Sequence, residues 1–378
     1  MLNLRFGFHE PSVEHVIDLI HKWIGRAGVL PLQLTINFGF CWTSKEYESR
    51  VERLRRIYNA LSKYASRWES LVISMPGNRS PSFPQLDHVP LLRYLSIGNL
   101  FHGCRAPFLS APRLTTLVIS GLQCKTSKIP TIPWRQLTVL HISKATSFSV
   151  ALDLIKRCPR LEELAISISH DMVTGPHRPR IEHATLREVS FPHACTIGSR
   201  AFLDSLSLPA LKRLSLIGTY FELTELFNQS NCELEALYLT NFQFNPDEFQ
   251  ECIGHESCKT LTCLYVTNDA RREMVNDELL IRLTCYEGEA AEPLCPNLER
   301  LTFRSCCTNG TFPGLLGEMV LSRCLGRAGV KQLQTFSFTA ISPLPAEDVE
   351  LLECASLNGL QFHVMTTHNW RKKEVIYV

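Results

Sequence analysis

Reactive side chains occur throughout this chain of 378 residues, but their spacing forms no known catalytic motif. The sequence holds no Gly-x-x-x-x-Gly-Lys phosphate loop, no Gly-x-Ser-x-Gly nucleophile elbow and no His-Glu-x-x-His zinc helix. No local spacing commits a serine, histidine or carboxylate to act as nucleophile, base or acid. We therefore predict a protein that is not an enzyme, with no catalytic residues and no cofactor.

The nearest approach to a metal site is the group His255, Cys258 and Cys263. Zinc in a structural site takes four nitrogen or sulfur ligands, and no fourth candidate stands at a suitable spacing. Cys263 also falls inside an expected strand, and no Cys-x-x-Cys pair occurs in the chain. We predict no metal site.

The side chains best suited to binding are two tyrosines and three arginines, Arg213, Tyr238, Tyr265, Arg300 and Arg304. Tyrosine and arginine combine a large contact area with a polar group, and both are enriched at binding hot spots. We predict that repeats around 211–304 form a contact patch for a protein partner. The alternative is that the tyrosines only stack across strands while the arginines remain solvated.

A repeated phrase positions these five residues. The phrase P-x-L-x-x-L-x-I occurs with small changes at 112–119, 159–166, 209–216 and 296–303. Its first apolar anchors are Trp68, Leu92, Leu114, Leu137, Leu161, Leu186, Leu211, Leu234, Leu261, Leu298, Leu333 and Leu357. Most steps between anchors fall within the roughly 20–29 residues of leucine-rich repeats. Two longer steps indicate insertions at 267–294 and 304–329, which could supply partner-specific loops.

The phrase also predicts the architecture of each repeat. Its last two apolar residues alternate with polar ones, as in a half-buried strand, and stacked repeats would share one core. Segments 149–158, 221–228 and 246–253 have helical patterning, and Pro159, Pro209 and Pro296 fall just before strands, where a helix should already have stopped. We predict an α/β leucine-rich-repeat solenoid, a horseshoe with parallel strands on the inner face and helices outside.

The first 75 residues follow a different pattern. Apolar residues within 13–27 form an amphipathic stripe, Gly28 suits a helix C-cap, and 32–36 alternates as a strand. A second helix is expected over about 45–67, and a strand over 68–73. We predict helix–strand capping repeats over 1–75 and irregular leucine-rich repeats over 76–378.

Composition and charge exclude several classes of protein. The net charge is +2, and the basic residues are scattered, so we predict no nucleic-acid partner. No apolar run of about 18 residues occurs and no secretory signal opens the chain, so we predict no membrane association. The 15 cysteines are odd in number, which favours reduced, buried thiols and a cytoplasmic or nuclear location.

One further pattern carries a family resemblance. The series is Lys22-Trp23-Ile24-Gly25-Arg26-Ala27-Gly28, then Leu30-Pro31-Leu32-Gln33-Leu34-Thr35-Ile36, then Ser66-Arg67-Trp68-Glu69-Ser70-Leu71-Val72-Ile73. It resembles the F-box/leucine-rich-repeat proteins of mushroom-forming (basidiomycete) fungi over essentially the whole chain. The resemblance implies a protein-recognition module that holds a substrate on its concave face for a cullin-type ubiquitin ligase.

No recognisable F-box is present in this chain, although the family places one before the first helix. A Skp-type adaptor is therefore expected as a partner only if an F-box exists upstream. The resemblance extends to the substrate-binding half of the family's role. The alternative is a stand-alone leucine-rich-repeat scaffold or regulator with no ligase link.

Overall fold

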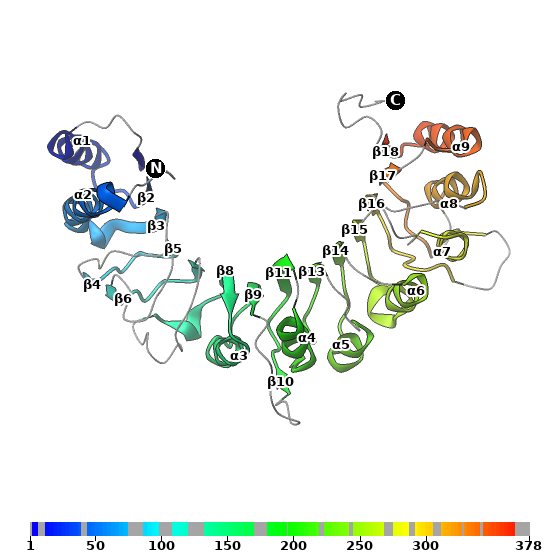
Figure 1. Cartoon of the computed structure of the whole chain (residues 1–378), viewed down its shortest axis with the longest axis horizontal. Helices are drawn as coiled ribbons and strands as arrows, with labels where there is room; N and C mark the ends of the chain where they lie inside the picture. The colour runs from blue at the N-terminus through cyan, green and yellow to red at the C-terminus, as the bar shows by residue number, and fades with distance from the viewer. Residues whose placement is uncertain are drawn as a thin grey trace. The chain divides into compact units, whose positions relative to one another are not determined.

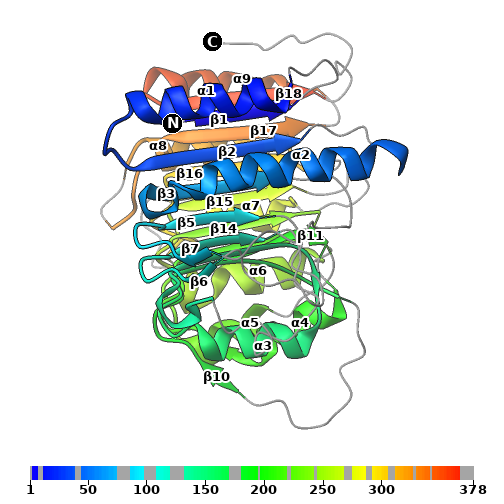
Figure 2. The ribbon, with the colours of Figure 1, turned by 90° about the vertical axis from the view of Figure 1, so that its left-hand side faces the viewer.

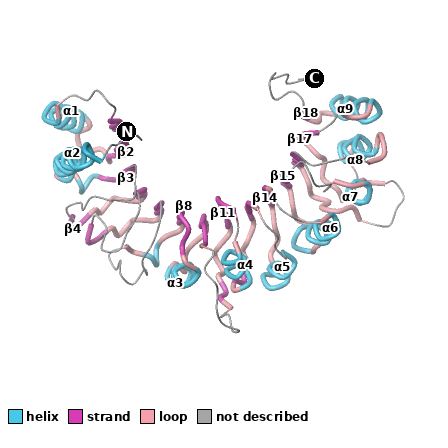
Figure 3. Tube along the Cα trace, in the orientation of Figure 1, coloured by secondary structure: helices cyan, strands magenta, loops and turns pink. Residues whose placement is uncertain are grey.

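The computed structural model describes most of the chain as two compact units, Met1–Val173 and Thr174–Val378. The described residues are 2–6, 12–38, 44–74, 86–97, 108–119, 132–169, 180–194, 196–218, 223–241, 245–267, 275–286, 292–304, 311–326, 329–340 and 343–366. Each unit is a segment of solenoid in which a parallel sheet carries helices on one side (Figures 1 and 3).

The sheet of the first unit follows the order of the chain. Its parallel strands are β1 (Leu2–Phe6), β2 (Leu32–Phe38), β3 (Trp68–Ser74), β5 (Tyr94–Ile97), β7 (Thr116–Ile119), β8 (Val139–Thr146) and β9 (Glu163–Ile168). Because each strand pairs with that of the next repeat, equivalent positions form columns: Ser96 pairs with Val118, Val118 with His141, and His141 with Ala165.

The outer layer of the first unit changes along the chain. It contains α1 (Val13–Arg26), α2 (Ser44–Ser62), the 3₁₀ turn η1 (Ala65–Arg67), the short paired strands β4 (Leu86–His88) and β6 (Phe108–Ser110), the 3₁₀ turn η3 (Trp134–Gln136), and α3 (Phe148–Arg157). Figure 2 shows α1 and α2 in front of β1 to β3. In the described parts of the repeats that follow β3, β5 and β7, the outer layer is formed by β4, β6 and η3 respectively.

The second unit repeats the arrangement with more helices. Its parallel strands are β11 (Glu188–Ala194), β13 (Arg213–Ile217), β14 (Ala236–Thr240), β15 (Cys263–Thr267), β16 (Arg300–Arg304), β17 (Thr335–Ala340) and β18 (Gln361–Thr366). Its outer helices are α4 (Ile197–Asp204), α5 (Leu223–Ser230), α6 (Pro246–Gly254), α7 (Asp277–Leu283), α8 (Leu315–Cys324) and α9 (Ala346–Leu357). A two-stranded pair, β10 (Ile181–Glu182) and β12 (Leu206–Ser207), and the 3₁₀ turn η4 (Glu256–Cys258) complete this layer.

Local sequence signals explain where several of these helices begin. Thr196 and Asn245 form capping boxes with Ser199 and Glu248, in which each side chain accepts a backbone N–H of the other residue. The Asn276 side chain accepts the Leu279 N–H at 2.9 Å and caps α7 in the same way. These caps satisfy backbone donors that the first helical turn leaves without partners.

The core lies between the sheet and the outer layer. Eleven of the twelve predicted anchors, from Trp68 to Leu333, are no more than 3% exposed. The last anchor was wrong, because Leu357 ends α9 and is 89% exposed whereas Leu360 is buried. The pairing of Phe336 with Phe362 places the last repeat two residues later than its leucine spacing indicated. The α9 helix extends over Leu357, and Gly359 (φ 94°) then turns the chain into β18.

The two long steps contain helices of the outer layer. In the segment 267–294, α7 buries Leu279, Leu280 and Leu283, and in the segment 304–329, α8 packs against α9. Their described parts therefore contribute to the core. Residues 268–274, 287–291, 305–310 and 327–328, and with them Glu287 and Glu289, lie outside the described residues.

The N-terminal elements follow the sequence with two differences. Helix α1 ends at Arg26, and Gly28 adopts a left-handed conformation (φ 55°) just after it, as predicted. The helix expected over 45–67 ends at Ser62 and is followed by the separate turn η1. Strand β1, which the sequence did not predict, pairs with β2. The boundary expected near residue 75 stays a prediction.

Candidate partner-binding surface

Four neighbouring strands of the second unit carry the five predicted binding residues. Tyr238 on β14 pairs directly with Tyr265 on β15, and β16 brings Arg300 and Arg304 alongside. Arg213 stands on β13, at the level of Arg300, and β14 and β15 lie between the two strands. All five occupy the outward positions that alternate with buried residues such as Leu237 and Leu264, so they share the face opposite the helices. We call these five residues the Tyr–Arg face.

The two tyrosines make direct contact. Their ring centroids are 6.1 Å apart and the rings are inclined by 44°, a separation at which aromatic pairs attract each other. The guanidinium carbon of Arg304 lies 5.6 Å from the centre of the Tyr265 ring, which is within range of a cation–π interaction. These contacts hold both rings in place on the sheet.

The hydroxyl group of Tyr238 turns toward the neighbouring strand, where the Cys263 thiol donates to it across 3.8 Å. Burial raises the pKa of Tyr238 above its usual value, and Cys263 adds to the rise, while the charges of Arg300 and Arg213 oppose it. Tyr238 therefore keeps its proton at neutral pH and can serve as a hydrogen-bond donor to a partner.

The arginines differ in what they contact. Arg213 Nη1 lies 3.2 Å from a carboxylate oxygen of Glu188 on β11. Arg300 is exposed and has no ion-pair partner within the described part of the chain. The pairing of Glu188 with Arg213 was not anticipated, although the two residues are neighbours in one column of the repeat pattern.

The first unit carries a different pair on the equivalent face. His141 on β8 and Glu163 on β9 approach to 2.6 Å between Nε2 and Oε1, and both side chains are about one-third exposed. An acid–histidine pair can support catalysis only when the histidine also contacts a nucleophile or substrate. In the described residues, His141 hydrogen bonds to no serine, threonine or cysteine.

The three residues weighed as zinc ligands do not meet. The His255 side chain caps η4 by accepting the Ser257 N–H at 3.1 Å, and Cys258, the last residue of η4, is buried. Cys263 instead lies on the sheet face beside Tyr238. Among the described residues no group of three or more histidines, cysteines or carboxylates could hold a metal ion.

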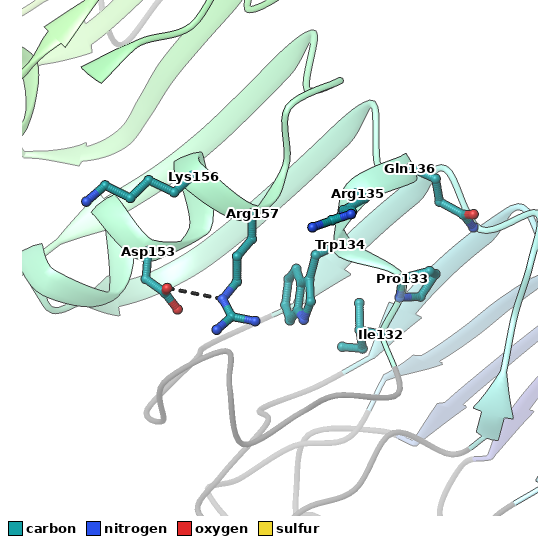
Figure 4. Close-up of a pocket in the computed structure, with 8 residues that line it drawn as sticks. All are labelled: Ile132, Pro133, Trp134, Arg135, Gln136, Asp153, Lys156 and Arg157. Carbon is teal, nitrogen blue, oxygen red and sulfur yellow. Dashed lines mark hydrogen bonds and ion pairs between the residues drawn. The ribbon is translucent and has the colours of Figure 1, made fainter.

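A hollow of about 660 Å³ lies in the outer layer of the first unit, lined by residues 132–136 of the η3 segment and by Asp153, Lys156 and Arg157 of α3 (Figure 4). Arg157 Nε donates to Asp153 Oδ1 at 3.1 Å. Asp153, the one acidic side chain among the residues that line the hollow, is therefore already paired. Gln136 is likewise engaged, because its amide donates to the carbonyls of Ala111 and Leu114. No sequence motif marked this hollow.

Most of the described cysteines are buried, as the sequence predicted. Eight of the nine described cysteines are buried, and Cys354 is exposed. Burial raises the pKa of the Cys158, Cys295 and Cys324 thiols to about 12, so these groups stay protonated and unreactive at neutral pH. No described helix is both long enough and apolar enough to cross a membrane.

Comparison with known proteins assigns this chain to no family. No protein-family model matches this sequence, and no curated protein matches it. Among solved structures, the crystal structure of a TLR13–ssRNA13 complex is similar over 82% of this chain, with 15% identity and a TM-score of 0.43. The match covers 38% of that protein's chain. This likeness is weak, and our fold assignment rests on the strand order and register described above.

Proposed function

We propose that this protein is a non-catalytic recognition module that binds a partner protein through the Tyr–Arg face. The observation that carries the proposal is the contact between Tyr238 and Tyr265 on the side of the sheet that helices leave uncovered in the described residues. Large, partly exposed aromatic side chains that are already held in place lose little conformational entropy on binding. Neighbouring arginines supply directional hydrogen bonds to such a partner.

Site-specific photo-crosslinking tests this proposal. A benzophenone amino acid at Thr302, between Arg300 and Arg304 on β16, would report on the Tyr–Arg face. The same group at Glu251, which is exposed on α6, would report on the helical side. We expect protein adducts at position 302 and not at 251 when the chain is expressed in its native cells.

The double substitution Tyr238→Ala with Tyr265→Ala should reduce adducts at position 302 by roughly tenfold, as loss of a binding hot spot does. Circular dichroism would confirm that the variant remains folded. Equal adducts at both positions, or adducts that the tyrosine substitutions leave unchanged, would contradict binding through this face.

The ligase connection is a second, finer part of the proposal. The resemblance of residues 22–36 and 66–73 to F-box/leucine-rich-repeat proteins supports a role in presenting a substrate for ubiquitin transfer. The test is to express the complete gene product and ask whether a Skp-type adaptor co-purifies with it. If no adaptor is recovered while crosslinking at position 302 succeeds, the protein acts as a stand-alone scaffold or regulator.

A further inference from the structure

The hollow in the outer layer of the first unit brings together charged groups from two elements. On α3, Lys156 and Arg157 stand three and four positions after Asp153, so the three side chains share one face of the helix, and none of them is buried. On η3, the Trp134 side chain is buried and Arg135 beside it is exposed. Both groups of residues line the same space of about 660 Å³.

The charges that line the hollow do not cancel. Its side chains include three cations, Arg135, Lys156 and Arg157, and one carboxylate, Asp153, which leaves two positive charges. The end of α3 contributes about half a negative charge, because its last carbonyl groups have no helical partners. Within the described part of the chain, no ion pair involves Arg135 or Lys156. The hollow therefore keeps an excess of about 1.5 positive charges that an anion could balance.

Two arginines are placed to bind the same anion. Arg157 Nε donates to Asp153 Oδ1 at 3.1 Å, and this bond holds the guanidinium group in place while its terminal nitrogens remain available. Figure 4 shows Arg157 extending from α3, and Arg135 from η3, toward the space beside Trp134, whereas Lys156 points along α3. Guanidinium groups suit phosphate and carboxylate groups, because each offers parallel N–H donors.

Size and lining favour a small organic ligand over an inorganic ion or a protein. Small-molecule sites usually enclose roughly 300–1,000 Å³, and this hollow falls within that range. Ile132, Pro133 and Trp134 provide an apolar side next to the arginines. Eight residues line the hollow, far fewer than the roughly 20–30 that a protein partner usually contacts. A ligand with an anionic group and an apolar body would match both sides of the hollow.

We infer that this hollow binds a small organic phosphate monoester, with the phosphate between Arg135 and Arg157 and the apolar body against Pro133 and Trp134. A phosphate monoester carries a charge of about −1.5 to −2 at pH 7, which balances the excess, whereas a single carboxylate balances only part of it. The inference goes beyond the proposed function, because the Tyr–Arg face belongs to the second unit. A phosphorylated side chain of another protein offers the same group, and the test separates these two sources.

Isothermal titration calorimetry of the full chain with phenyl phosphate tests the inference. Phenyl sulfate has the same ring and a smaller charge, and inorganic phosphate has no apolar body. We expect phenyl phosphate to bind about tenfold more tightly than either, because phenyl sulfate balances less of the excess charge and inorganic phosphate makes no contact with the apolar side. A 12-residue phosphoserine peptide represents the protein source and should also bind more weakly than phenyl phosphate.

Variants of the lining residues locate the site. Arg135→Gln should weaken binding of phenyl phosphate by roughly tenfold, because a charge-assisted hydrogen bond is lost. Lys156→Gln should weaken it by only about two- to threefold, because this charge acts from a greater distance through solvent. Arg26→Gln, which removes an exposed arginine of α1 in the same unit, is the matched control and should have no effect. Circular dichroism would confirm that each variant is folded.

The outcomes separate this inference from the proposed function. Equal binding of phenyl phosphate and phenyl sulfate, or binding that Arg135→Gln leaves unchanged, would overturn the phosphate site. So would the absence of phenyl phosphate binding at millimolar concentration. Tighter binding of the phosphoserine peptide than of phenyl phosphate would overturn the small organic ligand. Crosslinking at position 302 tests the proposed function independently, because no residue of the hollow belongs to the Tyr–Arg face.

Discussion

The two compact units present different chemistry at equivalent strand positions. In the first unit the column of outward residues at the middle of the strands contains Ser96, Val118, His141 and Ala165. His141 is paired with Glu163. In the second unit the same column contains the packed tyrosines, with arginines beside them. Because the buried anchors alone define the sheet, the outward positions are free to vary. Binding specificity can therefore be confined to a few repeats without altering the fold.

The outer layers differ as well. In the first unit, η3 is tied to a neighbouring repeat by the neutral amide of Gln136, which donates to two carbonyls. In the second unit, α8 carries Arg323, which is completely buried and donates to the carbonyls of Leu283, Leu294 and Cys295. A buried cation is thus used where the two longest repeats meet, and a neutral amide suffices where the repeats are short.

The largest effect is expected from Arg323→Met. The substitution leaves three buried carbonyls without their donor, and methionine cannot replace those hydrogen bonds. We expect the free energy of unfolding to fall by about 4 kcal/mol, because each buried carbonyl left without a donor costs about 1–3 kcal/mol. Chemical denaturation monitored by circular dichroism measures this change.

Gln136→Met is the matched substitution in the first unit. It removes two hydrogen bonds from a partly buried, uncharged group, and the expected loss is about 1.5 kcal/mol. If Arg323→Met and Gln136→Met lowered the free energy of unfolding equally, the buried cation would contribute no more to stability than the neutral amide does.

The next largest effect concerns helix packing. A Cβ atom at Gly317 of α8 would lie 2.6 Å from Leu351 Cβ and 2.9 Å from the Asp348 carbonyl oxygen of α9. The Gly317 N–H also donates to Asp348 Oδ1 at 2.8 Å, so the two helices cannot separate without losing this bond. We expect Gly317→Ala to destabilise the protein by about 3 kcal/mol through overpacking.

Gly25 provides the control in the first unit. It lies in α1, and an added Cβ would meet nothing within 4 Å. Gly25→Ala should stabilise the protein by about 0.5 kcal/mol, because alanine has the higher helix propensity. Thermal unfolding of both variants gives the comparison, and a stable Gly317→Ala protein would contradict the close packing of α8 on α9.

The sequence predicted the sheet well because the spacing of its buried leucines determines both the strands and their register. That register explains why the leucine spacing alone predicts Tyr238 and Tyr265 to be neighbours. The last repeat was misplaced because Leu357 and Leu360 both fit the leucine pattern. Only the extent of α9 distinguishes them, and it depends on packing against α8.

Other features of the site depend on side-chain directions that no motif specifies. The rotation of the Tyr238 hydroxyl toward Cys263, and the position of Arg304 over Tyr265, result from contacts between strands. The helices inside the two long steps were missed because their apolar residues were assigned to insertions. In the described parts of those steps, residues such as Leu279 complete the core.

The tyrosine pair should contribute to stability as well as to binding. A double-mutant cycle with Tyr238→Leu and Tyr265→Leu should give a coupling energy of about 1 kcal/mol, because the rings attract each other beyond their burial. The equivalent cycle in the first unit, His141→Ala with Glu163→Ala, should give about 0.5 kcal/mol for a partly exposed pair. Coupling energies that are equal, or larger in the first unit, would mean that the tyrosines are not held in place before binding.

The smallest effect concerns how the outer elements begin in each unit. In the first unit the Ser12 hydroxyl caps α1 by accepting the His15 N–H at 3.2 Å, and this group does not titrate in the physiological range. In the second unit His255 caps η4 through Nδ1, which accepts the Ser257 N–H, while Nε2 contacts Asn228 Oδ1 at 2.9 Å. Protonation of Nδ1 would remove this acceptor.

Burial lowers the pKa of His255 below its usual value of 6.5, although the nearby Glu256 opposes the shift. The unfolded chain therefore binds more protons near pH 6 than the folded protein does, and stability falls as the pH drops from above 6.5 toward the lowered pKa. His255→Asn keeps a capping acceptor and removes the titration. We expect this variant to lose less stability than the wild type between pH 7 and 5.5, by under about 1 kcal/mol. Ser12→Ala should instead lower the free energy of unfolding by an amount that does not change between pH 7 and 5.5. If the free energy of unfolding changed with pH equally in the wild type and in His255→Asn, protonation of His255 would not weaken its cap on η4.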